Sequence, residues 1–383
     1  MPSGTTTSIF WGTMTTIPIT SAQITADWLN SVLDDDVRDG ARIVGLDCDV
    51  IGEGVGFVGE VARLTLSYDE PSPSSVTSLI SKMPTANEGF KHIGLLLGLY
   101  EKEAGFYRDV APEMDLRVPR CYHNQVEDGI HFILLLEDLA PMRAGDQLAG
   151  CTLEEAELAL TTVARLHAHW WGRDDVARFD SWLPQPGSPY FEILKHAYLA
   201  AVDAFHEKWD HLVSPNIRSL VDRMAADYDG FVDVGVGREP HTFIHGDFRL
   251  DNMMFGEECD RFALVDFQLP FLANPLWDVV YFLAGSFEPA WRREHQDHLI
   301  ALYHQTLVDE GVSGYPLERC REDYRACALV LLGYLVTNAA DLDIDTINER
   351  GRELIDKIFS GYGTMIDDLD SADFVTSGSG ELS

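Results

Sequence analysis

The sequence is poor in basic residues compared with acidic ones. It contains 28 Lys and Arg residues against 63 Asp and Glu residues, which gives a formal net charge of -35. This excess of acid repels polyanions, so neither nucleic acid nor an anionic membrane surface is expected as a partner. The same charge would attract a cationic small molecule, but the acids are spread along the whole chain. Their spread favours the interpretation of a generally acidic surface.

The chain also lacks long apolar runs and paired cysteines. Its longest apolar run, 326–336, is short enough to be a buried helix, so no insertion into a membrane is expected. The N-terminus has no basic region followed by an apolar segment, and no secretory signal is predicted. The 6 cysteines form no CxxC pair and no dense cluster. This pattern is typical of reduced thiols and predicts a cytoplasmic protein.

The chain does have the length and apolar content for two compact lobes, with 383 residues of which 46% are hydrophobic. We expect an α+β protein in which a small β-rich N-lobe precedes a larger, mostly helical C-lobe. The expected divisions are a disordered N-terminus at 1–20, with Met14 as an alternative start, the N-lobe at 21–139, the C-lobe at 140–370 and a mobile tail at 371–383. The apolar spacing predicts helices at 24–37, 158–171, 190–212, 216–234, 290–310, 317–340 and 347–369.

Two short segments carry most of the chemistry-bearing residues. The apolar run 242–244 ends at His245, Gly246 and Asp247, and Asn252 follows five positions after Asp247. A second apolar strand then leads to Asp266. Phosphoryl transfer needs an acidic group that orients and deprotonates the acceptor hydroxyl, and oxygen ligands that hold Mg²⁺ on the phosphates. Asp247 suits the first role, and Asn252 with Asp266 suits the second.

This pattern resembles the HGDxxxxN…D signature of the aminoglycoside phosphotransferase and choline kinase superfamily, whose members are relatives of the protein kinases. The resemblance implies a protein-kinase-like two-lobe fold. It also implies transfer of the γ-phosphate to a hydroxyl of a small-molecule acceptor, with ATP and Mg²⁺ as cofactors. The alternative is an ordinary turn, because turns favour His, Asp and Asn anyway.

Elements in the N-terminal half occur in the order that a kinase-like ATP-binding lobe requires. Gly52, Gly54 and Gly56 precede an alternating strand at 61–66, and glycines there would let the backbone approach phosphates closely. Lys82 ends an apolar strand, where its ammonium could reach the α- and β-phosphates. A solvated lysine at a strand end is the alternative interpretation.

The helical segment 99–107 offers two glutamates as partners for Lys82. The resemblance favours Glu103 over Glu101, because related sequences carry this glutamate three residues before a Phe-Tyr pair. The buried run 132–136 ends abruptly at Glu137 and looks like the hinge that binds adenine, with Glu137 and Leu139 as its cofactor-binding residues.

Three features place the resemblance closest to the ecdysteroid-kinase-like branch and the bacterial phosphotransferase enzyme family. They are the Glu-Asp-Leu sequence of the hinge, the Phe-Gln pair after Asp266 and the long insertion between hinge and catalytic loop. Phe248 and Arg249 differ from the Leu-His of several aminoglycoside and choline kinases. A protein kinase is disfavoured because Trp277 follows Gln268 too closely for an activation loop.

Two other functions compete with this interpretation. A metallohydrolase would need a histidine cluster, drawn from His167, His169, His241 and His245. Residues two apart on a helix point away from each other, and no third zinc ligand of recognisable spacing follows. A nucleotide-binding pseudokinase or scaffold is disfavoured because the lysine, both aspartates and the asparagine are all present.

The sequence leaves the acceptor open among aminoglycosides, macrolides, choline-like amino alcohols, sterols and hydroxyacyl-CoA. We expect the acceptor to bind against the helices at 190–234 and 317–345, which carry the large aromatic residues Trp209, Tyr228, Tyr324 and Tyr334. An apolar cleft with one or two carboxylates would favour a bulky alcohol of the sterol or macrolide type, and this is the outcome that we expect.

Overall fold

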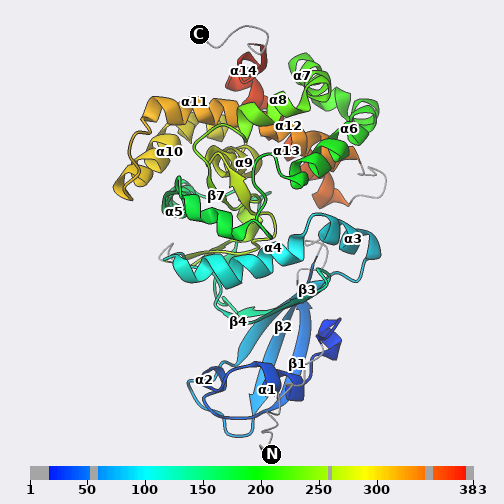
Figure 1. The fold of residues 1–383 in the computed structure, drawn as a ribbon, viewed down its shortest axis with the longest axis vertical. Helices are drawn as coiled ribbons and strands as arrows, with labels where there is room; N and C mark the ends of the chain where they lie inside the picture. Colours follow the sequence, from blue (N-terminus) through cyan, green and yellow to red (C-terminus); the bar gives the residue numbers. More distant parts are fainter. Residues whose placement is uncertain (1–16, 52–58, 258–260, 341–347, 377–383) are drawn as a thin grey trace, which may run out of the picture. The chain divides into compact units, whose positions relative to one another are not determined.

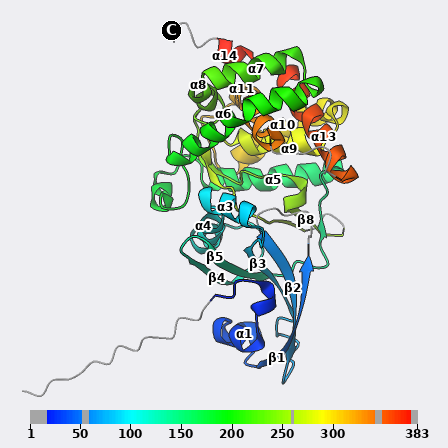
Figure 2. The same ribbon diagram turned by 90° about the vertical axis from the view of Figure 1, so that its right-hand side faces the viewer.

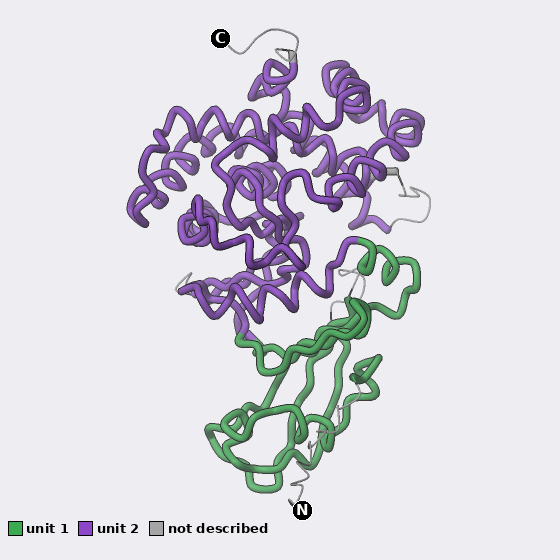
Figure 3. The backbone as a smooth tube through the Cα atoms, viewed as in Figure 1, with its two compact units in different colours: residues 1–96, 120–138 green, residues 97–119, 139–383 purple. Residues whose placement is uncertain are grey.

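A computed structural model describes residues 17–51, 59–257, 261–340 and 348–376 of the chain. These residues form two compact units (Figure 3). Unit 1 comprises residues 1–96 and 120–138, and unit 2 comprises residues 97–119 and 139–383. The protein thus has the expected small β-rich part and larger helical part, although segment 97–119 clusters with the helical unit and not with the predicted N-lobe.

Unit 1 is built on a five-stranded antiparallel sheet with the strand order β1-β2-β3-β5-β4. The strands are β1 (Ile43–Ile51), β2 (Gly59–Tyr68), β3 (Ser78–Pro84), β4 (Cys121–Glu127) and β5 (His131–Glu137). On β2, buried Leu64 and Leu66 alternate with the exposed Thr65. This period of two shows that one face of the strand packs into a core while the other faces solvent.

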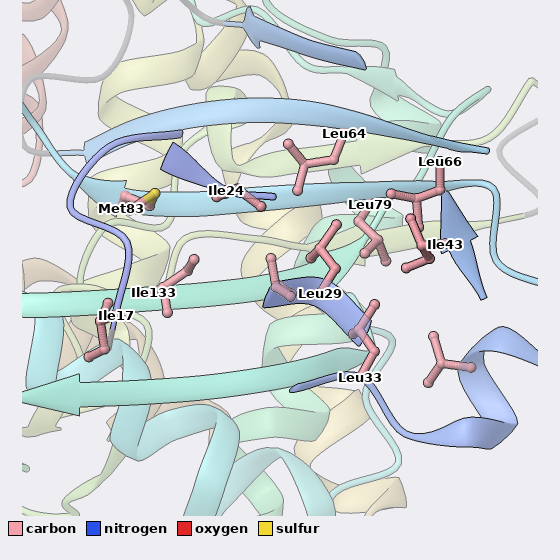
Figure 4. Packing of buried hydrophobic residues seen from close by; sticks show 12 residues of the cluster. Ile17, Ile24, Leu29, Leu33, Ile43, Leu64, Leu66, Leu79, Met83 and Ile133 are labelled. Atoms are coloured by element: carbon pink, nitrogen blue, oxygen red, sulfur yellow. The ribbon is translucent and has the colours of Figure 1, made fainter. Parts of the chain in front are cut away.

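The core of unit 1 lies between this sheet and the N-terminal helices α1 (Ala26–Val32) and α2 (Asp35–Arg38) (Figure 4). Helix α1 begins where the side chain of Thr25 accepts a hydrogen bond from the backbone N–H of Trp28, as an N-cap does. Leu29 and Leu33 then pack against Leu64 and Leu79 of the sheet. Unit 1 also contains the 3₁₀ turn η1 (Ser21–Gln23) and helix α3 (Glu88–Leu96).

Unit 2 is a set of helices around the almost completely buried helix α9 (Figures 1 and 2). Its helices are α4 (Leu99–Gly105), α5 (Leu153–His169), α6 (Pro189–Trp209), α7 (Pro215–Ala226), α8 (Tyr228–Gly235), α9 (Leu276–Ser286), α10 (Pro289–Asp309), α11 (Leu317–Cys327), α12 (Leu331–Ala340), α13 (Glu349–Asp368) and α14 (Asp373–Thr376). A capping box starts α5, where Thr152 and Glu155 cap each other.

Two small antiparallel sheets in unit 2 carry the polar turns that the sequence singled out. One pairs β7 (Thr242–Ile244) with β10 (Phe271–Ala273). The other has the order β6-β8-β9, with β6 (Arg143–Ala144), β8 (Met253–Phe255) and β9 (Phe262–Leu264). The loop between β7 and β8 contains Asp247, and the loop between β9 and β10 contains Asp266.

Several boundaries differ from those predicted. The helix predicted at 216–234 is two helices, because Asp227 caps a new one by accepting a hydrogen bond from Gly230 N–H. The helix predicted at 317–340 is interrupted by the 3₁₀ turn η7 (Ala328–Val330). The chain is also ordered beyond the expected limits. Ile17 packs into the core of unit 1, and Ser371, in the predicted mobile tail, donates a hydrogen bond to the carbonyl oxygen of Arg325.

Candidate active site

The turn after β7 is held in a conformation that only glycine accommodates at its centre. Gly246 has φ +79°, and a Cβ atom there would lie 1.9 Å from the carbonyl oxygen of Leu269. The carboxylate of Asp278 accepts hydrogen bonds from the backbone N–H groups of His245 (2.7 Å) and Gly246 (2.9 Å). These bonds satisfy two buried donors and fix the backbone just before Asp247. Asp278 therefore braces this loop.

A histidine lies behind this brace. His167 of α5 is fully buried, with its Nε2 atom 3.1 Å from Oδ2 of Asp278 and its Nδ1 atom 2.8 Å from the hydroxyl of Tyr303. Both ring nitrogens are therefore occupied by protein groups. His169 instead contacts Arg173, and His241 contacts the carbonyl oxygen of Gly237. The described residues contain no cluster of three His, Cys, Asp or Glu side chains that could hold a metal, so nothing in them supports the metallohydrolase alternative.

The carboxylate of Asp247 is held through one of its two oxygens. Oδ2 accepts hydrogen bonds from Asn252 Nδ2 (2.8 Å) and Arg249 Nε (3.2 Å). Asn252 Nδ2 also donates to the carbonyl oxygen of Asp247 at 2.9 Å. Within the described part of the chain these bonds leave Oδ1 open to accept a hydrogen bond from another molecule. A carboxylate fixed in this way can orient a hydroxyl group.

Arg249 is a residue whose role the sequence did not predict. Its guanidinium also contacts Asp251 Oδ2 (2.7 Å) and Gln147 Oε1 (3.3 Å). Burial raises the pKa of Asp247, but Arg249, His245 and Asn252 together outweigh it, so the pKa of Asp247 lies below its usual value. Asp247 is therefore ionised at neutral pH. An anion beside a fixed guanidinium is a good hydrogen-bond acceptor and only a weak base.

The two expected metal ligands lie on neighbouring strand ends. β8 and β9 pair antiparallel, and the backbone N–H of Val265 donates to the carbonyl oxygen of Asn252 at 3.1 Å. Asp266 follows directly, with the unusual positive φ of 66°. A non-glycine residue in this region is rare and frequent at functional sites. The amide nitrogen of Asn252 is bonded to Asp247, so its oxygen Oδ1 is the atom available for a cation. An amide oxygen beside a carboxylate suits Mg²⁺, which prefers oxygen ligands.

The predicted nucleotide-binding residues are spread over both units. Gly52, Gly54 and Gly56 lie outside the described residues. Lys82 is a buried residue of β3 in unit 1, and Glu103 is a fully buried residue of α4 in unit 2. Glu101 is exposed, so burial agrees with the choice of Glu103 as the glutamate with a specific role. The pairing of Lys82 with Glu103 stays a prediction.

The two predicted hinge residues differ in what their backbones can offer. Glu137 ends β5, and its backbone N–H donates to the carbonyl oxygen of Arg120 at 2.8 Å. Its carboxylate accepts the backbone N–H of Arg120 at 3.0 Å. The backbone donor of Glu137 is therefore already used within the sheet. Leu139 is buried, and its carbonyl oxygen accepts the backbone N–H of Met142 at 2.9 Å.

Three tyrosines from distant helices pack together beside the loop between β7 and β8. Tyr334 of α12 donates its hydroxyl hydrogen to the carbonyl oxygen of Gly246 at 2.9 Å. The rings of Tyr281 on α9 and Tyr362 on α13 pack with it, at centroid distances of 4.5 and 6.5 Å. Burial raises the pKa of all three phenols, so they are neutral hydrogen-bond donors at ordinary pH. Of these, the sequence singled out only Tyr334.

The other aromatic residues predicted to line the acceptor site fill the helical core instead. Trp209 packs against Phe359, and Tyr228 packs against Tyr198. Tyr324 donates its hydroxyl hydrogen to Gln296 on α10. Asp203 and Glu207 are exposed on α6. These positions follow the general rule that most large aromatic side chains supply core volume.

The ecdysteroid kinase-like family model matches residues 53–312. This range contains the β7–β8 turn, the Asp266 loop and the brace at Asp278. The chain belongs to the ecdysteroid kinase-like family. The branch inferred from the Phe-Gln pair and the hinge sequence is thereby confirmed. A search of the curated proteins finds no significant match.

Solved structures share the kinase-like fold of this ecdysteroid kinase-like protein. A candidate aminoglycoside phosphotransferase from Ralstonia eutropha superposes with a TM-score of 0.56 at 16% identity, covering 90% of this chain and 97% of that chain. The GDP complex of wild-type aminoglycoside 2'-phosphotransferase-IIIa gives a TM-score of 0.51 at 14% identity, covering 82% and 93%. Identities this low establish the fold alone. The predicted α+β, protein-kinase-like fold class is therefore confirmed.

None of the helices described in the structure is both long and apolar enough to cross a membrane. No disulfide joins any of the five described cysteines, Cys48, Cys121, Cys151, Cys320 and Cys327.

Proposed function

We propose that this member of the ecdysteroid kinase-like family is a Mg-ATP-dependent kinase that phosphorylates a hydroxyl group of a small molecule. The observation that carries the proposal is the way in which the two carboxylate oxygens of Asp247 are bound. Its Oδ2 atom is bound by Asn252 and Arg249, its Oδ1 atom accepts no hydrogen bond from the described residues, and Asn252 and Asp266 lie at the ends of the paired strands β8 and β9. Family membership and the kinase-like fold support the same reaction class.

In the proposed reaction the acceptor hydroxyl donates a hydrogen bond to Oδ1 of Asp247. Its oxygen attacks the γ-phosphorus in line, the bond to the bridging oxygen of ADP breaks, and the proton passes to Asp247 late in the transfer. Because the pKa of Asp247 is lowered, its main contribution would be to position the acceptor hydroxyl. It would accept the proton only after the bond to phosphorus has formed.

Asn252 and Asp266 would hold Mg²⁺, which would neutralise charge on the phosphates. We assign Lys82 to the α- and β-phosphates, with Glu103 as its orienting partner, and the glycine-rich segment 52–59 to covering them. The adenine would meet the hinge after Glu137, with Leu139 as the more suitable residue because the backbone N–H of Glu137 is used within the sheet. Complexes of related proteins with GDP support a nucleotide site.

The acceptor is proposed to bind against unit 2, since Asp247 and the tyrosines around it belong to that unit. Tyr281, Tyr334 and Tyr362 present mainly apolar rings with a hydroxyl at the edge, which suits a bulky alcohol. Hydrogen exchange with and without acceptor tests this placement: protection is expected within residues 190–234 and 317–345, and protection confined to 43–139 would contradict it. The cytoplasmic location inferred from the cysteine pattern is part of the proposal.

The test is a screen of Mg-ATP consumption over sterols, macrolides, aminoglycosides, amino alcohols and hydroxyacyl-CoA, each run with wild type and with Asp247→Asn. Turnover that depends on one acceptor class and disappears in the variant supports the proposal. Tight Mg-ATP binding without turnover on any class would favour the alternative, a nucleotide-binding pseudokinase or scaffold.

A further inference from the structure

One lysine of unit 2 is buried without a counter-ion. Lys102 of α4 is 3% exposed, and its Nζ atom has no hydrogen-bond partner among the described residues. The ammonium lies 3.6 Å from the centroid of the Tyr190 ring on α6. A cation-π contact offsets only part of the cost of removing an ammonium from water. With 3% exposure, the side chain does not reach back to solvent as buried-stem lysines usually do.

A second buried donor lies in the same region. Gln268 is 8% exposed, and its Nε2 atom has no hydrogen-bond partner in the described part of the chain. Residues before and after it in the chain pack against the segment that carries Lys102 and against the Tyr190 ring. Phe267 stacks on Phe106, four residues after Lys102, at a centroid distance of 3.6 Å. Phe271 packs against Tyr190, the ring that Lys102 contacts, at 6.1 Å. Gln268 thus lies in a segment that both of these ring contacts hold beside α4 and α6.

Packed side chains connect the Tyr190 ring to the catalytic loop. Phe271 packs edge-on against Trp277 at a centroid distance of 4.8 Å. Trp277 Nε1 donates to the hydroxyl of Tyr334 (3.2 Å), which donates to the carbonyl oxygen of Gly246 (2.9 Å). Asp247 is the next residue. Lys102 and Asp247 therefore lie at the two ends of one continuous set of packed side chains within unit 2.

The charges around Lys102 favour an anionic ligand and oppose a cationic one. Tyr190 is the titratable group that faces it from α6, and burial raises the pKa of that phenol, which stays neutral. On its own helix, Glu101 is exposed and Glu103 is buried, and no ion pair between Lys102 and either glutamate occurs among the described residues. An ammonium group of a substrate at the Tyr190 ring would meet the positive charge of Lys102.

We propose that Lys102 and Gln268 form a subsite for a carboxylate of the acceptor, so that the preferred substrate is a hydroxy acid with an apolar body. The inference rests on the proposed kinase function and names its substrate class. The two oxygens of a carboxylate match an ammonium and an amide N–H₂, two donors that find no hydrogen-bond partner among the described residues. The aromatic side chains between the subsite and Asp247 then contact the apolar body, and the hydroxyl meets Oδ1 of Asp247.

The test uses hydroxy acids paired with their methyl esters: cholate with methyl cholate, and 4-(hydroxymethyl)benzoate with its methyl ester. Wild type is expected to favour the acids by roughly tenfold or more in both binding and kcat/KM, as a charge-assisted hydrogen bond predicts. Lys102→Met removes this preference, Lys102→Arg keeps part of it, and Gln268→Leu reduces it. The KM for ATP stays unchanged in both Lys102 variants.

A pH profile separates binding from a merely structural role. Burial lowers the pKa of Lys102 to about 7, so the lysine loses its positive charge as pH rises above about 7. The kcat/KM for the acids then falls over this alkaline limb of the pH profile, whereas the kcat/KM for the esters does not. The limb is absent in Lys102→Met. Equal affinity of wild type for acid and ester, or an acid preference that Lys102→Met retains, overturns the inference. An intact acid preference in binding, with no phosphorylation of any alcohol, instead overturns the proposed function and leaves the anion subsite standing.

Discussion

At the scale of single residues, Arg249 decides how Asp247 can act. The Nε atom of Arg249 lies 3.2 Å from Oδ2 of Asp247 and keeps this carboxylate ionised. A strongly basic catalytic group would need a raised pKa. In the proposed mechanism Asp247 therefore contributes orientation first and proton acceptance last.

Asp247→Asn is accordingly expected to lower kcat by roughly 10²–10⁴-fold while leaving ATP affinity nearly unchanged, because an amide holds the hydroxyl without accepting its proton. Steady-state kinetics with the identified acceptor and a nucleotide titration measure the two effects. Asp203→Asn is the matched control, since it makes the same change at an exposed position of α6. Wild-type turnover in Asp247→Asn would remove this residue from the reaction.

The two proposed metal ligands should differ in their effect on the Mg²⁺ requirement. Asp266→Ala removes an anionic ligand and should raise the Mg²⁺ concentration needed for half-maximal activity at least tenfold, or abolish activity. Asn252→Ala removes a neutral ligand and should shift that concentration less. It should also lower kcat, because Asn252 Nδ2 holds Oδ2 of Asp247. Mg²⁺ titrations of both variants test the ranking, and an unchanged requirement in Asp266→Ala would contradict it.

Lys102 should influence stability in a defined pH window. Its pKa falls from 10.5 to about 7 on folding, so the unfolded chain binds more protons between these values. The cost of burying the lysine is then complete below about pH 7 and disappears toward pH 10.5. Lys102→Met should raise the free energy of unfolding most near pH 6, by an amount on the order of a few kcal/mol, and least near pH 10.

Lys208→Met, at an exposed position of α6, is the control for this experiment and should show no such pH window. If Lys102→Met gained the same free energy of unfolding at pH 6 and at pH 10, the lysine would not be the titrating group.

The sequence predicted as candidate site residues those that lie within one short motif, and the structure brings them close together. His245, Gly246, Asp247 and Asn252 are contiguous, and the close pairing of β8 with β9 adds Asp266. It did not predict Tyr281 or Tyr362, which α9 and α13 bring to the loop from distant positions. Nor could it predict Lys102, because an isolated lysine in a helix is usually exposed and only tertiary packing reveals its burial.

At the scale of elements, helix α9 holds the catalytic loop in place. Its residues 276–286 are all buried, and its first turn supplies Asp278 to the N–H groups of His245 and Gly246. Asp278 stands in the first turn of the helix that begins after Asn274 and Pro275. The second interaction of Asp278, with His167 of α5, depends on the packing of α5 and leaves no local signal in the sequence.

Asp278→Ala should therefore destabilise the protein strongly, by about 2–5 kcal/mol, because two buried N–H groups and a buried histidine lose their acceptor. Thermal unfolding measures this loss, and turnover of the folded fraction should fall as well because Asp247 loses its fixed backbone. Glu294→Ala, at an exposed site of α10, should change the melting temperature little. If both variants melted alike, the brace would be of no energetic importance.

The breaks within predicted helices also belong to this scale. The apolar period continues through 216–234 and 317–340, so periodicity alone predicts single helices. Asp227 ends one of them because its side chain competes for the N–H of Gly230 and caps a new helix. The sequence does not reveal this competition between side chain and backbone, because Asp227 looks like any other aspartate in a helix.

At the scale of the whole molecule, the chain consists of two units that each have a core of their own. The order of β-rich and helical parts was predictable, because a period of two dominates the first part and helical spacing dominates the second. The exact division of the chain between the two units was not predictable. Segment 97–119 belongs to the helical unit, in which Phe106 stacks on Phe267 and approaches Phe243. Contacts between positions so far apart in the chain leave no local signal.

The net charge of -35 leads to a further prediction about the molecule as a whole. Mutual repulsion among the acids opposes the compact state, and salt screens it. The melting temperature should therefore rise by several degrees between about 10 mM and about 0.5 M NaCl. A variant carrying Asp203→Asn, Glu207→Gln and Glu294→Gln, all exposed, should melt higher at low salt and respond less to added salt. Differential scanning calorimetry of both proteins measures this difference. A melting temperature that falls with NaCl would show that the ion pairs of the native state, such as Arg63 with Asp138, outweigh the general repulsion.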